Sequence, residues 1–208
     1  MKQSKETFAI KSAILLRELL HGSFWLVYLL LRKNKYFRED LLFWTDNSSF
    51  LQNNFSGFLR LISESPPFRS LVYFRLKNQN NIGRLTAIIY SIFYKGMNNL
   101  YIACNSIGGR FYIQHGFCTD IFAESIGSSF WVNQQVTIGW KNNSGCPTIG
   151  NNVSVGAGAK VLGKIRIGDN VKIGANAVVL KDVPDNCTIV GVPGRIVRLN
   201  GAKCNIEL

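Results

Sequence analysis

The second half of the chain repeats an aliphatic residue every six positions. The step runs without interruption through Ile149, Val155, Val161, Ile167, Ile173 and Val179. A second small or branched apolar residue stands four positions after each of them, and glycine follows most of them. Neither a helix nor an antiparallel strand repeats on six. The period predicts a parallel β-helix, in which short strands form walls and each coil stacks on the next.

Two departures from this step mark the places where the coil is disturbed. The step from Ile138 to Ile149 is eleven, and the polar stretch "GWKNNSGCPT" between them predicts a loop that projects from the wall. The step from Ile113 to Ile126 is thirteen, and this interval contains His115 in "FYIQHGFC". We therefore expect any functional site to lie near the coil between these two irregularities.

The first half of the chain has a different pattern. Residues 7–98 hold long runs rich in Leu, Phe and Tyr, broken at "TDNSS", "SESPPF" and "KNQNNIG". Ser63 or Ser65 is predicted to cap a helix that starts at "PPF", because proline is tolerated in the first turn. The fold class is thus predicted as α+β, with a helical domain over residues 1–98, a β-helix over 99–199 and a tail over 200–208.

The charge is unevenly distributed between these halves. The net charge is +12; residues 1–99 hold 14 Lys/Arg against 6 Asp/Glu, and residues 100–208 hold 10 against 6. Such an excess favours a polyanionic partner. No recognition helix, zinc finger or aromatic ribonucleoprotein motif occurs, so nucleic acid is not the predicted partner. An acidic polymer substrate or an anionic membrane surface remains.

The location of the protein is predicted from two further features. The apolar segment over residues 10–31 contains Arg17 and Glu18 and lacks a small-residue cleavage site, which predicts a buried or membrane-leaning helix rather than a span or a signal peptide. The five cysteines are odd in number and form no C-x-x-C pair, as is typical of a reducing compartment. We expect a cytoplasmic protein, with peripheral contact with the cytoplasmic membrane left open.

The repeats resemble those of a known family. The stretches "IGGRFYIQHG", "VNQQVTIGW", "IGNNVSVGAGAKVLGKIRIGDNVKIGANAVVLKDVP" and "IVGVPGRIVRL" are similar to the hexapeptide-repeat acyltransferases, specifically the serine acetyltransferase-like branch that includes capsular and exopolysaccharide O-acetyltransferases. This resemblance covers about residues 100–199. It implies a left-handed β-helix, a homotrimer, and acetyl-CoA lying in the groove between neighbouring β-helices.

The same resemblance implies a direct transfer in which a histidine takes the proton from an acceptor hydroxyl. His115 matches that histidine. Imidazole chemistry agrees, because a side chain with an ordinary pKa near 6.5 is largely neutral at pH 7 and can accept the proton of an alcohol. The alternative for a lone histidine is a structural role, which is our prediction for His21 in the apolar helix.

Further site residues follow from the resemblance. Contacts to the coenzyme map onto Trp140, Gly156, Ala157 and Ala175, although small residues also simply fit tight β-helix turns. Lys160 and Arg195 are candidates for its phosphates, with a solvated surface as the alternative. On the acceptor side the candidates are Gln114, Asp120 and Cys146. No metal is expected, since a γ-type carbonic anhydrase on this fold needs three histidines.

The chain departs from the serine acetyltransferase pattern at two places. Gly145 and Cys146 stand where an Arg-His pair holds the substrate carboxylate, and Leu100 stands where an acid orients the histidine. The first departure favours a sugar hydroxyl of a capsular polysaccharide, exopolysaccharide or O-antigen, or of a precursor, as the acceptor. The alternatives are a serine O-acetyltransferase, a streptogramin-type acetyltransferase and a non-catalytic β-helix scaffold.

Overall fold

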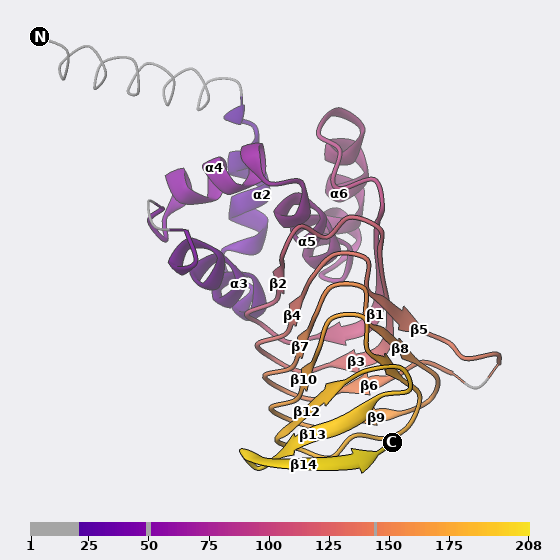
Figure 1. The fold of residues 1–208 in the computed structure, drawn as a ribbon. Helices are drawn as coiled ribbons and strands as arrows, with labels where there is room; N and C mark the ends of the chain where they lie inside the picture. The colour runs from indigo at the N-terminus through magenta and orange to yellow at the C-terminus, as the bar shows by residue number, and fades with distance from the viewer. Residues whose placement is uncertain (1–20, 49–50, 144) are drawn as a thin grey trace, which may run out of the picture.

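A computed structural model describes residues 21–48, 51–143 and 145–208 and consists of a helical region followed by a β-solenoid (Figure 1). The predicted α+β order, with helices first and a coil of hexapeptide repeats second, is confirmed. The helices are α2 (Phe24–Leu31), α3 (Lys35–Asp46), α4 (Phe55–Glu64), α5 (Pro66–Lys77) and α6 (Asn81–Phe93). They gather at one end of the solenoid, and the C-terminal strands close the other end.

Capping residues in the sequence determine where these helices start. Four of them begin after a residue whose side chain accepts a hydrogen bond from a backbone N–H three positions on: Asn34, Asn54, Ser65 and Asn80. Such caps satisfy one of the free N–H groups of the first turn. Of the two predicted caps before "PPF", Ser65 has this role, and the Ser63 hydroxyl donates to a backbone carbonyl instead.

The apolar N-terminal segment is only partly described. Its residues 10–20 lie outside the described part of the chain. The part that follows contains α2, whose Phe24, Val27 and Leu31 side chains are buried. None of the helices in the described ranges is long and apolar enough to cross a bilayer.

The solenoid has three walls, each built by stacking short parallel strands. The first wall stacks β2 (Tyr112–Ile113), β4 (Trp131–Val132), β7 (Ser154–Val155), β10 (Lys172–Ile173) and β12 (Cys187–Val190), so the solenoid has about five turns. The second wall stacks the start of β3 (Thr119–Ile126) on β5 (Thr137–Gly139), β8 (Lys160–Leu162) and β11 (Val178–Val179). The third wall stacks the end of β3 on β6 (Thr148–Ile149) and β9 (Arg166–Ile167).

The repeat residues fill the interior as the six-residue period predicts. On the first wall, Ile113, Val132, Val155, Ile173 and Ile189 are in register and buried. The predicted loop between Ile138 and Ile149 does project from the solenoid, between β5 and β6 (Figure 1). Each coil buries little apolar surface alone, so stability comes from the stacking of neighbouring coils.

The two ends of the solenoid are covered differently. At the C-terminal end, β13 (Arg195–Leu199) and β14 (Ala202–Glu207) form antiparallel pairs below β12, so the predicted tail over residues 200–208 contains a strand. At the other end, β1 (Leu100–Ile107) pairs with the whole of β3, and α5 lies against β1. The helices therefore cover the coil that contains His115.

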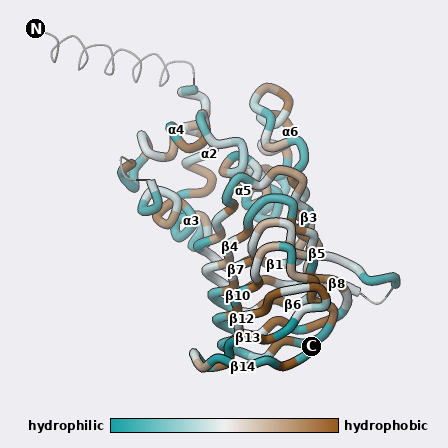
Figure 2. The backbone as a smooth tube through the Cα atoms, in the orientation of Figure 1, coloured by the Kyte–Doolittle hydropathy of each residue, from teal (hydrophilic) through white to brown (hydrophobic). Residues whose placement is uncertain are grey.

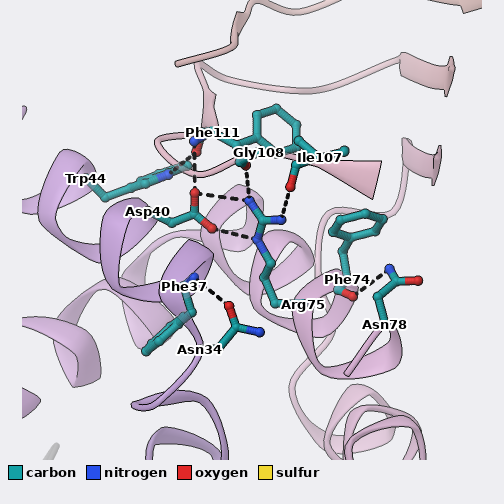
Figure 3. Close-up of polar contacts among 10 residues, drawn as sticks. All are labelled: Asn34, Phe37, Asp40, Trp44, Phe74, Arg75, Asn78, Ile107, Gly108 and Phe111. Atoms are coloured by element: carbon teal, nitrogen blue, oxygen red, sulfur yellow. Dashed lines mark hydrogen bonds and ion pairs between the residues drawn. The ribbon is translucent and has the colours of Figure 1, made fainter. Parts of the chain in front are cut away.

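A buried ion pair joins the helices to this first coil (Figure 3). The Asp40 carboxylate accepts from Arg75 Nε at 2.7 Å and from the Phe111 N–H at 2.9 Å. Arg75 also donates to the backbone carbonyls of Ile107 and Gly108, each at 2.6 Å. Burial raises the pKa of the Asp40 carboxyl, whereas Arg75 and the Phe111 N–H lower it. Both side chains are almost fully buried, so each depends on the other for its charge.

Candidate functional site

His115 lies on a turn that is two residues longer than its counterpart in the next coil. The first and second walls are seven positions apart here, from Ile113 to Asp120, but five apart in the next coil, from Val132 to Thr137. The extra residues are accommodated by a left-handed backbone, with φ of 67° at His115 and 66° at Gly116. Left-handed residues also stand at the corners of other coils, such as Gln135 and Asn176, so the added length is what distinguishes this turn. The imidazole is exposed at the corner between the two walls.

Apolar groups pack against the inner side of this turn. A Cβ on Gly116 would lie 2.7 Å from Ile113 Cγ2, 3.3 Å from Met97 Sδ and 3.5 Å from Leu100 Cδ2. Leu100 therefore lies beside the turn, on its inner side. Within the described residues no hydrogen bond or ion pair holds the His115 ring.

Gln114 is directed along the first wall. Its Oε1 accepts from Trp131 Nε1 at 3.2 Å, and the same indole N–H lies 3.0 Å from Asn133 Oδ1. The amide is thereby fixed next to the histidine but on the outer face of the wall.

Small residues line the same corner in the later coils, beyond Gln134 and Gln135 of the coil next to the turn. The N–H groups of Gln135, Gly158 and Asn176 donate to carbonyls of the coil before, at 2.9, 3.0 and 2.8 Å. These bonds align Ala157–Gly158 and Ala175–Asn176 with the His115 turn, and we call these four residues the small-residue corner. At about 4.8 Å for each coil, it continues roughly 14 Å from the turn. The predicted residues Ala157 and Ala175 are thus in line with Phe117, two residues after His115.

Three other predicted residues have structural partners here. A Cβ on Gly156 would lie 2.7 Å from the Ala175 N, so glycine is required for the coils to approach each other. The Lys160 ammonium donates to the Gln135 carbonyl at 2.8 Å and to Thr137 Oγ1 at 3.0 Å, which holds it near the corner. Asp120 is in register with Thr137 on the second wall.

Arg195 lies at the C-terminal end of the solenoid. Its Nη2 is 2.8 Å from Glu207 Oε1 across the β13–β14 hairpin. The preceding Gly194 N–H donates to the Val178 carbonyl of β11 at 2.9 Å, so the residue follows the last coil of the second wall. The pair is exposed and leaves donors of the guanidinium free for a ligand.

Trp140 and Cys146 belong to a separate place in this chain. They lie with Glu124, Asn142 and Lys164 around an open hollow of about 970 Å³ under the projecting loop. The Trp140 ring is 53% exposed and lies 5.3 Å from the Phe122 ring. Because the strands of the second wall separate this loop hollow from the corner of His115, the structure divides the predicted residues into two groups.

Several residues near these groups carry no signal in the sequence. Gln134 Oε1 is buried without a hydrogen-bond partner among the described residues, in the coil next to the His115 turn. Glu124 and Lys164 line the loop hollow. Their positions become evident only when the coils are stacked, since Glu124 and Lys164 are forty residues apart in sequence.

A smaller hollow between α5 and β1, of about 380 Å³, contains two groups that burial keeps protonated. Burial raises the pKa of the Cys104 thiol to about 11 and that of the Tyr73 hydroxyl to about 12. Neither is a base at neutral pH. His21, the other histidine, packs against Phe24 and Tyr94, with ring centroids 6.2 and 5.3 Å away. Among the described residues no group of three metal-binding side chains occurs.

Comparison with known proteins agrees with the repeat pattern. Residues 146–181 match the family described as bacterial transferase hexapeptide (six repeats). A serine acetyltransferase of Bacillus pumilus is 46% identical over 108 residues, which are 50% of this chain and 49% of that protein. The chain thus spans about half the length of this curated relative, and other relatives with the same name are matched to a similar extent.

Solved structures share the fold over most of the chain. The Neisseria gonorrhoeae serine acetyltransferase in complex with serine is 25% identical, with a TM-score of 0.62, over 83% of this chain and 73% of that one. A Brucella abortus serine acetyltransferase in complex with coenzyme A is 24% identical, with a TM-score of 0.58, over 86% and 74%. The second likeness concerns the fold alone.

Proposed function

We propose that this chain, whose second half is a hexapeptide-repeat β-helix of the serine acetyltransferase-like type, is an acetyl-CoA-dependent O-acetyltransferase with His115 as its general base. One observation carries the proposal. The histidine is exposed on a two-residue-longer, left-handed turn at the head of the small-residue corner. The names of the curated relatives support acetyl transfer as the reaction.

The reaction requires one proton acceptor and no covalent enzyme intermediate. A neutral His115 nitrogen takes the proton of the acceptor hydroxyl while that oxygen attacks the thioester carbonyl. The C–S bond then breaks, and the imidazolium returns the proton to the leaving sulfur. General-base help of this kind is worth about 10²- to 10⁴-fold in rate.

The small-residue corner is the proposed position of the coenzyme. Ala157, Gly158 and Ala175 leave room for an extended chain to lie against the wall, with its thioester at His115. Lys160 uses two of its three N–H donors on the wall, so one is left for a phosphate or an amide oxygen. Arg195, beyond the last coil, is the further candidate for a phosphate.

A homotrimer would explain why Cys146 and the loop hollow are distant from the base in one chain. The loop with Cys146 projects from the solenoid, away from the His115 corner of its own chain (Figure 1). In a trimer of parallel β-helices, the groove between two neighbours is bordered by a corner of one copy and a loop of the other. The loop hollow is then an acceptor site that the partner completes.

Two acceptors remain, each favoured by a different observation. The names of the curated relatives favour L-serine, and this is the more direct support. The loop favours a sugar hydroxyl, because Gly145 and Cys146 carry no cation for an amino-acid carboxylate, while Trp140, Asn142 and Glu124 supply an aromatic face and polar groups. This second acceptor would be a sugar of a capsular polysaccharide, an exopolysaccharide, an O-antigen or a precursor of one of them.

Release of the coenzyme thiol from acetyl-CoA decides between them. The purified chain is assayed with L-serine and with a panel of nucleotide-linked and free sugars. If a sugar is the acceptor, its kcat/KM exceeds that of L-serine and falls in Trp140→Ala. Preference for L-serine would instead favour the serine O-acetyltransferase, and a lack of thiol release with every acceptor would leave the β-helix as a scaffold.

A further inference from the structure

The outer face of α6 is apolar, although the helix lies at the surface. Six large side chains are between 46% and 75% exposed: Ile82, Leu85, Ile88, Ile89, Ile92 and Phe93. They lie three, four or seven positions apart, so most of them share one face of the helix. In Figure 2, hydrophobic residues alternate with others along the tube of α6, at the helical end of the molecule. Contiguous exposed apolar surface of this kind marks an interaction site.

The packing of α6 keeps these side chains outward. The face toward α5 is made of small or polar residues, with Gly83, Thr86 and Ala87 buried. A Cβ on Gly83 would lie 2.4 Å from the Leu76 carbonyl oxygen, so α5 and α6 are in contact through their backbones. Rotation of α6 to bury its isoleucines would require this contact to break. The packing of α6 on α5 therefore fixes the exposure of this apolar face in the monomer.

The segment of the chain that contains α6 carries charges of a single sign. No Asp or Glu occurs between residues 65 and 119, whereas this stretch contains six Lys and Arg. Three of them are exposed on or next to α6: Lys77 at the end of α5, Arg84 within α6, and Lys95 after it. An apolar helix face with basic residues beside it is the combination that binds the surface of an anionic bilayer.

The length of α6 limits how it meets the bilayer. Thirteen residues of helix extend roughly 20 Å, less than the hydrocarbon core of about 30 Å. The helix can therefore lie in the interface but cannot span it. Met97, four residues after the end of α6, packs against the His115 turn. Docking of α6 would therefore bring this turn close to the membrane.

We propose that α6 docks this protein onto the surface of an anionic lipid bilayer, with Ile82, Leu85, Ile88, Ile89, Ile92 and Phe93 in the interface and Lys77, Arg84 and Lys95 on the headgroups. This inference stands on the helix and its charges and does not require the acetyltransferase proposal. If both hold, docking favours the second of the two proposed acceptors, in the form of a glycan presented at the membrane.

Co-sedimentation of the full chain with lipid vesicles tests the docking. The vesicles are phosphatidylcholine with or without phosphatidylglycerol. Wild type is expected to sediment with the anionic vesicles and to be released by salt. Leu85→Gln/Ile92→Gln is expected to bind about tenfold more weakly at unchanged net charge. The matched control is Leu180→Gln/Ile206→Gln, which removes two exposed apolar side chains of the solenoid and should bind like wild type.

Three outcomes would overturn the proposal. They are no sedimentation of the wild type, equal binding to neutral and anionic vesicles, and equal binding by the α6 variant and wild type.

Light scattering on the same samples identifies the competing occupant. If the α6 variant has a lower mass than wild type and unchanged vesicle binding, the face is an interface between copies of this chain. Circular dichroism on each variant shows that the fold is intact.

Discussion

The residue on which the proposed function depends is held by backbone rather than by a side-chain partner among the described residues. His115 has a left-handed φ, and Ile113 and Leu100 pack against the inner side of its turn at Gly116. A carboxylate would ordinarily fix the tautomer of such an imidazole, and leucine cannot. Under the proposed function the turn itself would orient the ring, and an acceptor or a neighbouring copy would supply any further hydrogen bond.

A thiol provides a residue-scale prediction. Burial raises the pKa of Cys104 to about 11, so it stays protonated at mildly alkaline pH, and the protonated thiol is a poor nucleophile. Iodoacetamide should therefore label the exposed Cys118 well before Cys104 in the native protein. Peptide mapping by mass spectrometry gives the order of labelling. Equal rates in the folded state would contradict the assigned burial, and denatured protein, in which both react, is the control.

At the scale of the elements, the six-residue period predicted the walls of the solenoid. The walls follow from the six-residue step because only one arrangement buries Ile149, Val155 and Val161 together. The projecting loop and the Ser65 cap were also readable, since each interrupts or starts a pattern. The loop hollow was not, because Glu124 and Lys164 become neighbours only through coil stacking, which no local pattern encodes. Which face of α6 is exposed depends on the contact between Gly83 and Leu76. This contact joins two helices, so no pattern within α6 alone predicts it.

A pair of glycines tests the close approach of the coils. Gly156→Ala places a methyl group 2.7 Å from the Ala175 N, and backbone there cannot move without disturbing the ladder. We expect a loss of about 1–3 kcal/mol in the free energy of unfolding. Gly139→Ala is the matched control, because its nearest neighbour would be Phe122 Cβ at 3.8 Å, an ordinary contact. Urea unfolding measures both, and similar losses in the two variants would contradict the stacking geometry.

At the scale of the whole molecule, the helices and the solenoid are joined by a polar contact in an otherwise apolar core. Asp40 and Arg75 connect α3 and α5 to the carbonyls of Ile107 and Gly108, immediately before the coil of His115. Such a pair adds little net stability compared with apolar residues but is costly to break. The ion pair fixes the orientation of the helices against the first coil. It thereby determines which residues surround the His115 turn.

Removal of one partner tests that junction. Arg75→Met leaves the Asp40 carboxylate buried without its cation and should lower the free energy of unfolding by about 3–5 kcal/mol. Arg60→Met removes the exposed ion pair with Glu64 on α4 and should cost at most about 0.5 kcal/mol. Denaturation followed by tryptophan fluorescence compares the two. A small effect of Arg75→Met would mean that the junction is not a buried pair.

The kcat/KM for acetyl transfer by His115→Asn tests the central claim most directly. Asparagine accepts the left-handed backbone of this turn but cannot act as a base at neutral pH, so fold and turn are kept while the proton acceptor is lost. We predict an unchanged thermal midpoint, retained acetyl-CoA binding by calorimetry, and a fall in kcat/KM of about 10²- to 10⁴-fold. A His115→Asn protein that keeps the wild-type kcat/KM with its acceptor would contradict the account.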